Sequence, residues 1–392
     1  MYNKNKGGVI MNEEILFMPL GGGQRVGASC YYLRLGNANI ILDAGIGIEN
    51  GVVFEPDIYS LLTSSFLESL NQLNQVFISH AHIDHVGFLL KLMKGIRNPE
   101  VYMTEMTSLL TKYQLYDKDY MLGSIKTEEE RLLAQRILDG VINVSYMQSL
   151  DFINYKVTFL PAGHIPGAMM MLFEYGKRKI LYTGDYSVDK TFLTDGYFIP
   201  DNIKIDTIIM CGLHAKHPNY IKKSNSLYSA IKRIYSEVTS GSSVMCYVPQ
   251  LSKGIEFIKT LNEYNFQNVP IYIDKSIMPI VEKFEKLSIP ILNENNHVVY
   301  GKSINIPHIY VTSENKCSAS KLYKCIKVDF SLHDDFQDMK RFIKKINPKQ
   351  VYIVHCPKER SCDEYTIEQT VMLDGECRTQ FVFAEEGEIY KL

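Results

Sequence analysis

Short apolar runs, separated by turns that contain glycine and asparagine, dominate the first 80 residues of the chain. Runs of this length and punctuation are typical of buried or half-buried β-strands. The sequence predicts such strands at residues 15–20, 30–35, 39–43 and 75–80. Leucine and phenylalanine recur at helical spacing over residues 59–73, which predicts a helix there. Residues 86–150 are predicted to be mostly helical, most clearly over 128–138.

The pattern returns to strands after residue 150 and then changes again. Strands are predicted at residues 156–160, 169–174, 179–183 and 207–210. Helices at 226–238, 254–264 and 277–287 then alternate with strands at 243–248, 270–273 and 308–311, followed by a helix at 335–346 and strands at 350–354 and 379–384. The alternating part is typical of an α/β unit with parallel strands. The change near residue 210 and the reversal near 327 predict one domain, residues 11–210 and 327–392, with residues 211–326 inserted into it.

The composition narrows the class of protein. A chain of 392 residues with 46% hydrophobic residues is long enough to bury the cores of two domains. We expect no membrane segment, because no apolar run approaches the roughly 18 residues that span a bilayer, and no signal peptide. The eight cysteines include no Cys-x-x-Cys pair, which favours reduced thiols in the cytoplasm. The net charge of −2 does not by itself indicate a nucleic-acid-binding protein, although it allows a locally basic groove.

The segment His80-Ala-His82-Ile-Asp84-His85 carries the strongest chemical signal in the chain. Three imidazoles and a carboxylate follow a predicted strand, at a junction that can turn all four inward. Imidazole and carboxylate are the ligands that Zn²⁺ prefers in sites that keep a position open for water. The alternative is a surface loop that merely contains histidines, but four such groups seldom fall at this spacing by chance.

Four further residues that can bind a metal follow other predicted strands. They are Asp43, His164 in Pro-Ala-Gly-His, Asp185 in Thr-Gly-Asp, and His355. Each of them alone is accounted for as a cap or turn residue. Together with the histidine cluster, they predict that several strands end at the same edge of the fold and that a metal-binding side chain follows each of them. Gly163 is expected to let the backbone approach closely before His164.

The His-x-His-x-Asp-His motif, together with Asp43, His164 and Asp185, resembles the metallo-β-lactamase superfamily. More narrowly, the chain is similar to the β-CASP branch of nucleases, which includes bacterial ribonuclease J and the endonuclease subunit of the mRNA 3′-end processing complex. The supporting segments are residues 19–30, 162–168, 180–187, 330–333 and 353–355. The resemblance implies an α/β fold, an αββα sandwich of the metallo-β-lactamase type with an inserted β-CASP-like α/β domain.

The resemblance also implies a metal site and a reaction. It assigns one zinc ion to His80, His82 and His164 and a second to Asp84, His85 and His355, with Asp185 bridging both. Asp43 would orient a ligand histidine by a hydrogen bond. The two zinc ions would generate a hydroxide that cleaves a phosphodiester, with Asp84 and Asp185 as catalytic carboxylates and His333 as the general acid. Because RNA-acting members carry histidine at the position of His355, the expected substrate is RNA rather than DNA.

Two departures from the family pattern leave alternatives open. The inserted segment is shorter than is usual, and Cys211 stands where active relatives carry a carboxylate that partners the general acid. Without that carboxylate His333 is expected to be a weaker proton donor, unless His214 or His217 replaces it. One alternative is a degenerate member that binds RNA or a partner protein and cleaves weakly or not at all. Another is a hydrolase of a small ester or thioester. A protein partner and a homo-oligomer are both compatible with the sequence.

Overall fold

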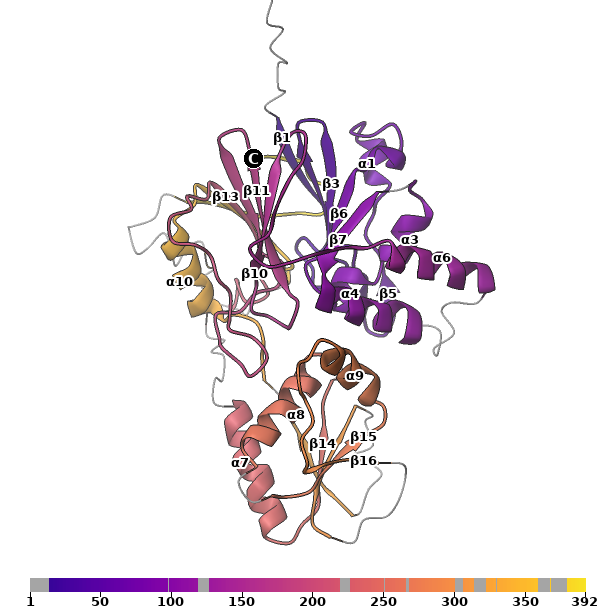
Figure 1. Ribbon diagram of the computed structural model, residues 1–392. Coiled ribbons are helices and arrows are strands. Elements are labelled where there is room, and N and C mark those ends of the chain that lie inside the picture. Colours follow the sequence, from indigo (N-terminus) through magenta and orange to yellow (C-terminus); the bar gives the residue numbers. More distant parts are fainter. Residues whose placement is uncertain are drawn as a thin grey trace, which may run out of the picture.

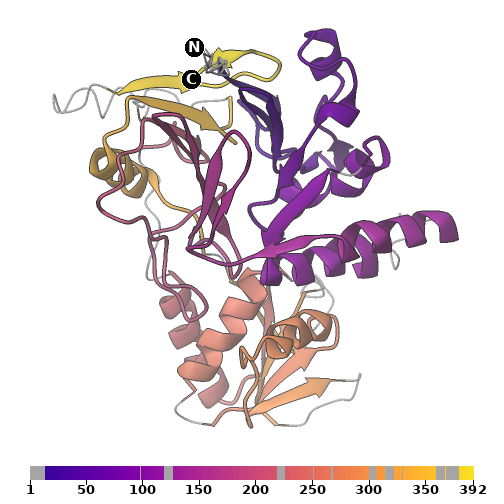
Figure 2. The same cartoon turned by 45° about the horizontal axis from the view of Figure 1, so that its top comes forward.

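The computed structural model describes residues 14–97, 99–118, 127–218, 226–249, 251–265, 268–299, 306–313, 322–328, 330–358, 367 and 379–392. Two seven-stranded sheets pack face to face, and a five-stranded sheet with its own helices lies below them in Figure 1. Strands β1 and β21 pair with each other on the side of the molecule opposite the five-stranded sheet (Figure 2). Residues 11–13, where the first domain is predicted to begin, lie outside the described residues.

The first sheet has the order β21-β1-β2-β3-β6-β7-β8. Pairing is antiparallel from β21 to β3 and parallel from β3 to β8. Its strands are β1 (Ile15–Gly21), β2 (Cys30–Leu35), β3 (Ala38–Leu42), β6 (Gln75–Phe77), β7 (Glu100–Thr104), β8 (Ile142–Val144) and β21 (Tyr390–Lys391). A separate hairpin is formed by β4 (Gly47–Glu49) and β5 (Val52–Phe54).

The second sheet has the order β20-β19-β13-β12-β11-β10-β9. Pairing is parallel from β20 to β12 and antiparallel from β12 to β9. Its strands are β9 (Ser149–Asp151), β10 (Lys156–Pro161), β11 (Met169–Tyr175), β12 (Arg178–Tyr182), β13 (Thr207–Cys211), β19 (Gln350–Val354) and β20 (Gln380–Phe383). The parallel strands β12, β13 and β19 therefore end at the same edge of the sheet.

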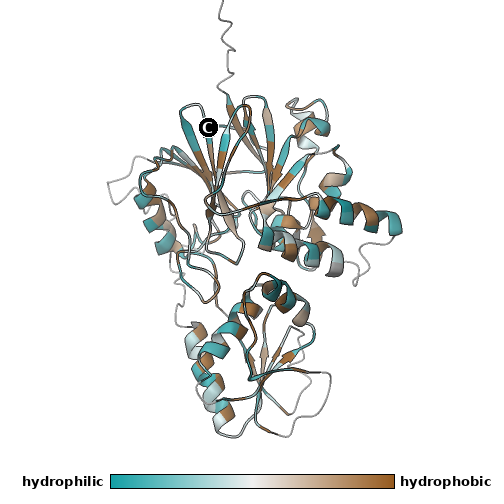
Figure 3. Cartoon of the chain, in the orientation of Figure 1, coloured by the Kyte–Doolittle hydropathy of each residue, from teal (hydrophilic) through white to brown (hydrophobic). Residues whose placement is uncertain are grey.

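Aromatic side chains fill the space between the two sheets. Phe77 of the first sheet and Phe173 of the second are fully buried, with ring centroids 5.7 Å apart in an edge-to-face arrangement. Tyr31 and Tyr182 form a second such pair across the sheets at 5.7 Å. Figure 3 shows apolar residues concentrated along the strands and polar residues prominent on the surrounding helices. Burial of this apolar surface is the main force that holds the sandwich together, and the predicted αββα fold is confirmed.

Helices cover the outer faces of the sandwich. They are α1 (Ser60–Thr63), the 3₁₀ helix η1 (Leu70–Gln72), α2 (Ile83–Val86), α3 (Leu89–Lys94), α4 (Glu105–Lys112), the π-helix η2 (Tyr113–Lys118), α6 (Glu128–Asp139) and α10 (Phe336–Ile346). The single helix predicted over residues 59–73 is wrong, because only α1 and η1 form there. Ser65 has a φ of 61°, a left-handed conformation that ends a right-handed helix.

Residues 86–150 are less helical than predicted, because β7 and β8 extend the first sheet. Residues 101–104 are all buried, and β7 pairs in parallel with β6. A short apolar run is compatible with either a strand or a buried helical turn. Contact with the neighbouring strand β6 makes this run a strand, and that contact is not visible in the local pattern.

The third sheet has the order β16-β15-β17-β14-β18, and all its strand pairs are parallel. It contains β14 (Val244–Tyr247), β15 (Ile271–Asp274), β16 (Asn296–Val299), β17 (Ile309–Thr312) and β18 (Lys324–Lys327), with helices α7 (Ser226–Thr239), α8 (Lys253–Glu263) and α9 (Met278–Lys286). The predicted α/β unit with parallel pairing is thus confirmed, although β16 and β18 were not predicted. The predicted domain boundaries stay a prediction.

Within the part of the chain that the structure describes, every helix is too short or too polar to cross a bilayer.

Candidate metal centre

The metal-binding side chains predicted from the sequence gather at one edge of the sandwich, where strands of both sheets end. Asp43 follows β3, and the segment from Ser79 to His85 follows β6. From the second sheet, His164 follows β10, Asp185 follows β12 and His355 follows β19. Gly163 is necessary for this arrangement, because a Cβ atom there would lie 2.3 Å from the carbonyl carbon of Gly196.

The first set of donors consists of His80, His82, His164 and Asp185, whose ligand atoms all lie within 4.8 Å of one another. Nδ1 of His82 is 3.1 Å from Nε2 of His80 and 3.2 Å from Nε2 of His164. Oδ2 of Asp185 is 3.7 Å from Nε2 of His80 and 3.8 Å from that of His164. Three ring nitrogens and a carboxylate oxygen that converge in this way can all direct lone pairs to one point, so the geometry fits a metal ion.

The second set consists of Asp84, His85 and His355. Nε2 of His355 is 3.7 Å from Oδ2 of Asp84, and Nε2 of His85 is 3.5 Å from Oδ2 of Asp185. Both Nε2 of His85 and Oδ1 of Asp185 are buried without a hydrogen-bond partner. Buried polar atoms are nearly always paired, so two orphans at one point fit a second cation. Asp185 lies between the two sets.

Asp43 is fully buried and accepts four hydrogen bonds. Its partners are the backbone N–H (2.6 Å) and hydroxyl (2.7 Å) of Ser79, the Tyr182 hydroxyl (2.5 Å) and Nδ1 of His85 (2.7 Å). The bond to His85 keeps its proton on Nδ1 and turns Nε2 toward Asp185. Asp43 and His355 have φ values of 60° and 52°, a strained conformation for residues other than glycine that is concentrated at functional sites.

Four more partners of the donor histidines were missed by the sequence analysis, and one of them is Ser79, whose Oγ is 3.0 Å from Nδ1 of His80. Ser29 Oγ is 3.0 Å from Nδ1 of His355, the backbone carbonyl oxygen of Leu332 accepts a hydrogen bond from Nδ1 of His164 at 2.8 Å, and Ser252 Oγ is 2.9 Å from Nε2 of His82. Ser29 at least lies within a segment that carries the family resemblance. Leu332 also lies within such a segment, residues 330–333, although a main-chain carbonyl has no side-chain signature. Ser252 gave no signal, because serine is common everywhere.

The electrostatics of the first set favour neutral imidazoles. Burial, and to a lesser extent the neighbouring His85, hold the pKa of His80 well below its ordinary value. Burial and His164 lower the pKa of His82 to about 3, and burial lowers the pKa of His164. These rings therefore keep free lone pairs at neutral pH, which is the form that binds metal.

The ring of His85 behaves differently. Burial opposes its protonation, but Asp185 and Asp43 outweigh burial and hold the pKa of His85 well above its ordinary value. Burial likewise opposes ionisation of Asp185, whereas His85 and then His333 hold the pKa of Asp185 well below its ordinary value. A metal ion at this point would take over the role of the imidazolium proton next to the Asp185 carboxylate.

Cys211 and His333 form a third group with Asp185, again with ligand atoms within 4.8 Å. Nδ1 of His333 is buried without a hydrogen-bond partner and lies 3.7 Å from Oδ2 of Asp185. Burial, and then His164, hold the pKa of His333 well below its ordinary value. Burial, and to a lesser extent Asp185, hold the pKa of Cys211 well above its ordinary value, so the thiol stays neutral. The structure therefore brings a neutral thiol to the side of His333.

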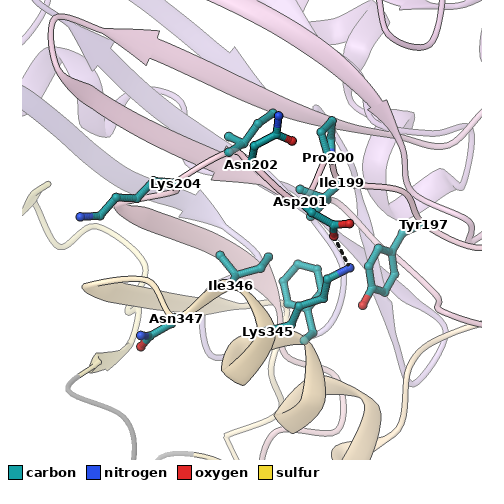
Figure 4. A pocket seen from close by; sticks show the side chains of 11 residues that line it. Tyr197, Ile199, Pro200, Asp201, Asn202, Lys204, Lys345, Ile346 and Asn347 are labelled. Carbon is teal, nitrogen blue, oxygen red and sulfur yellow. Dashed lines mark ion pairs between the residues drawn. The ribbon is translucent and has the colours of Figure 1, made fainter.

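His214 and His217 were considered in the sequence analysis as substitutes for the missing carboxylate. Neither His214 nor His217 belongs to any of the three donor groups that the described residues form. A cavity of about 340 Å³ lies beside α10 (Figure 4). It is lined by Tyr197, by residues 199–204 and by the C-terminal part of α10, where Lys345 pairs with Asp201 at 3.2 Å. That cavity contributes no residue to the donor groups.

The sandwich of two sheets, with donor groups at the strand ends, defines a metallo-hydrolase fold. Residues 23–209 match the model of the metallo-β-lactamase superfamily, and residues 323–365 match the Zn-dependent metallo-hydrolase RNA specificity domain. The second match includes both His333 and His355. The chain belongs to the metallo-β-lactamase superfamily and, within it, to the β-CASP branch.

Several relatives of known name are similar to this chain. It is 29% identical over 266 residues to RNase aCSPSF2 of Saccharolobus solfataricus, covering 67% of this chain and 51% of the relative. It is 27% identical over 274 residues to endoribonuclease ysh-1 of Neurospora crassa, covering 66% and 31%. It is 30% identical over 270 residues to probable RNase MJ4 of Methanocaldococcus jannaschii, covering 67% and 59%. The chain thus spans about a third to three fifths of these relatives.

One solved structure has the same overall fold. A protein of unknown function from Enterococcus faecalis V583 superposes with a TM-score of 0.64, covering 97% of this chain and 100% of that one. The sequence identity is 12%, so this likeness concerns the fold alone.

Proposed function

We propose that this protein is a zinc-dependent phosphodiesterase that cleaves RNA. The observation that carries the proposal is the sharing of Asp185 by two adjacent donor sets. Its Oδ2 lies 3.7 Å from Nε2 of His80 in the first set and 3.5 Å from Nε2 of His85 in the second. A carboxylate between two sets of imidazole and carboxylate donors suits two Zn²⁺ ions better than one.

In this proposal each donor set holds one ion. The residues are His80, His82 and His164 for the first ion, Asp84, His85 and His355 for the second, and Asp185 for both. Two bound zinc ions supply activation of a water molecule and neutralisation of the charge that develops on the phosphate. Asp84 and Asp185 keep the ions in place, and Asp43 keeps His85 in the tautomer that binds through Nε2.

His333 is the proposed proton donor to the oxygen that leaves the phosphate. Its ring centroid lies 4.3 Å from that of His164, so it stands beside the first donor set. The neighbouring thiol of Cys211 carries no charge that would stabilise the imidazolium. We therefore expect a slow enzyme at neutral pH, because a general acid contributes roughly 10²–10⁴-fold to such reactions.

RNA is the proposed substrate because the match to an RNA specificity domain spans residues 323–365 and the named relatives are ribonucleases. A protein partner is also proposed, since another relative is named as a subunit of a cleavage and polyadenylation factor. A homo-oligomer is the alternative assembly. We place the protein in the cytoplasm, on the absence of paired cysteine motifs in its sequence.

Cys211 favours a second candidate function, an RNA-binding member of the family with weak or no cleavage. The two candidates are separated by incubating zinc-loaded protein with end-labelled RNA and DNA, beside His82→Ala. The first candidate requires RNA cleavage by the wild type that His82→Ala abolishes. RNA binding with no cleavage at any pH would support the second candidate. Hydrolysis of small esters or thioesters alone would refute both.

A further inference from the structure

The two ring nitrogens of His82 have separate partners. Nδ1 faces the first donor set, 3.1 Å from Nε2 of His80 and 3.2 Å from Nε2 of His164. Nε2 points the other way, to the hydroxyl oxygen of Ser252 at 2.9 Å. An imidazole that binds a metal through Nδ1 keeps its proton on Nε2. Ser252 Oγ is then the acceptor of the Nε2–H of His82.

Helix capping does not account for the position of this serine. Ser252 is the N-cap residue of α8, yet its side chain makes no capping hydrogen bond. By contrast, the N-cap side chains of Thr104 and Thr127 accept hydrogen bonds from the backbone of their own helices. Serine at an N-cap normally uses its hydroxyl in that way. In Ser252 the hydroxyl contacts His82 instead.

The contact crosses the junction between the sandwich and the third sheet. Ser252 lies between β14 and α8, is 9% exposed, and is 170 positions from His82 in the sequence. A cavity of about 210 Å³ lies at this junction, lined by His82, Gln114, Pro249, Leu251 and Ser252, among others. Gln114 Nε2 donates to the carbonyl oxygen of Ala81 at 2.7 Å. The turn that carries His82 is thus held by Gln114 on its backbone and by Ser252 on its ring.

We propose that Ser252 is a positioning residue for His82, through which the inserted unit helps to form the metal centre. This inference rests on the proposed zinc site. The outer partner of a ligand histidine fixes the ring orientation and the tautomer, and its loss typically lowers metal affinity about 10–100-fold. The other described partners of donor histidines are Asp43, Ser79 and Ser29, which lie beside strands of the first sheet, and Leu332, which lies in the segment before α10. Ser252, in contrast, comes from the unit built on the third sheet.

The test compares two substitutions of nearly equal shape. Ser252→Thr keeps the hydroxyl, whereas Ser252→Val replaces it with a methyl group that also keeps water from taking its place. Ser243→Val is the matched control, because Ser243 Oγ contacts Nδ1 of His308 at 3.2 Å within the same unit and away from the donor groups. Zinc affinity is measured by competition with a chelator, and the ligand field by the visible absorption of the cobalt-substituted protein. Circular dichroism verifies folding.

Ser252→Val is expected to lower the affinity for one zinc ion about 10–100-fold and to change the cobalt spectrum, while Ser252→Thr and Ser243→Val match the wild type. Equal affinity and equal spectra in Ser252→Val and the wild type would overturn the inference and leave the proposed zinc site intact. Equal losses in Ser252→Val and Ser252→Thr would overturn it too, because packing and not the hydroxyl would then matter. A wild type that binds no zinc would refute the zinc site itself.

Discussion

Oδ2 of Asp43 and Nδ1 of His85 are joined by a hydrogen bond of 2.7 Å, and both side chains are buried. The other ring nitrogen of His85 lies 3.5 Å from Oδ2 of Asp185. A single carboxylate on the first sheet thus determines which nitrogen of His85 faces the point shared by the two donor sets. The orientation of the ring depends on Asp43 as much as on the position of His85 in the chain.

Replacing Asp43 with asparagine should weaken metal binding. Asparagine adopts the left-handed backbone of this position readily, but its amide NH₂ cannot accept the hydrogen bonds that one carboxylate oxygen accepts. We expect zinc affinity to fall about 10–100-fold and the free energy of unfolding to fall by about 1–3 kcal/mol. Zinc titration and urea denaturation measure the two effects.

Asp206→Asn is the control for this prediction. The carboxylate of Asp206 also accepts a backbone hydrogen bond, from Lys179 at 3.0 Å, and pairs with Lys349 at 2.8 Å, outside the donor groups. Equal zinc affinity in Asp43→Asn and Asp206→Asn would show that Asp43 has no part in metal binding.

The purified protein is expected to contain close to two zinc ions per chain. Asp185→Ala should lose most of both, because Asp185 lies between the two donor sets, whereas His355→Ala should lose mainly one. Elemental analysis after expression in zinc-replete medium measures the content. Asp195→Ala, an exposed carboxylate paired with Lys190, should keep both ions. A wild-type content near zero would refute the metal centre.

The zinc-loaded protein should cleave single-stranded RNA in preference to DNA of the same sequence. The expectation rests on His355 and on the match of residues 323–365 to an RNA specificity domain. Initial rates on end-labelled substrates of both kinds measure the preference, with His82→Ala as the inactive control. Equal rates on RNA and DNA, or cleavage of DNA alone, would contradict it.

Cys211→Asp should make the enzyme faster at neutral pH. Burial, and to a lesser extent His164, hold the pKa of His333 well below its ordinary value. The proton that His333 would donate is therefore lost as the pH rises through this lowered pKa. A carboxylate at position 211 would raise that pKa and move the falling limb of the pH–rate profile to higher pH. Up to about 10²–10⁴-fold in rate is available from a general acid. Pre-steady-state rates across pH 5–9 are the measurement, for wild type and variant.

Cys211→Ser is the control, since serine is neutral and should leave the profile unchanged. His333→Ala in the Cys211→Asp background should remove the gain. The account of a missing partner fails if Cys211→Asp slows the reaction while His214→Ala abolishes it, because His214 would then be the partner.

The fold class could be predicted from the sequence, and so could the candidate donors that the structure brings together. The His80–His85 segment and the residues that follow β10, β12 and β19 all lie at the ends of strands. Strand ends can be predicted from the local sequence, because apolar runs alternate with turn residues. The sequence also singled out Cys211, because comparison with the family motif shows a cysteine where active relatives carry a carboxylate. That comparison needs no coordinates. The helix over 59–73 was wrong and β7 was missed, because short apolar runs take their conformation from the strand or loop beside them.

The way in which these side chains are held depends on the tertiary structure. Asp43 could be expected to orient some histidine, but the choice of His85 depends on how β3 and β6 pair. The contact of Ser252 with His82 joins residues 170 positions apart and depends on the docking of one folded unit against another. Local patterns report burial and chain direction, whereas a hydrogen bond between distant side chains depends on angles and distances that arise only when both units are packed.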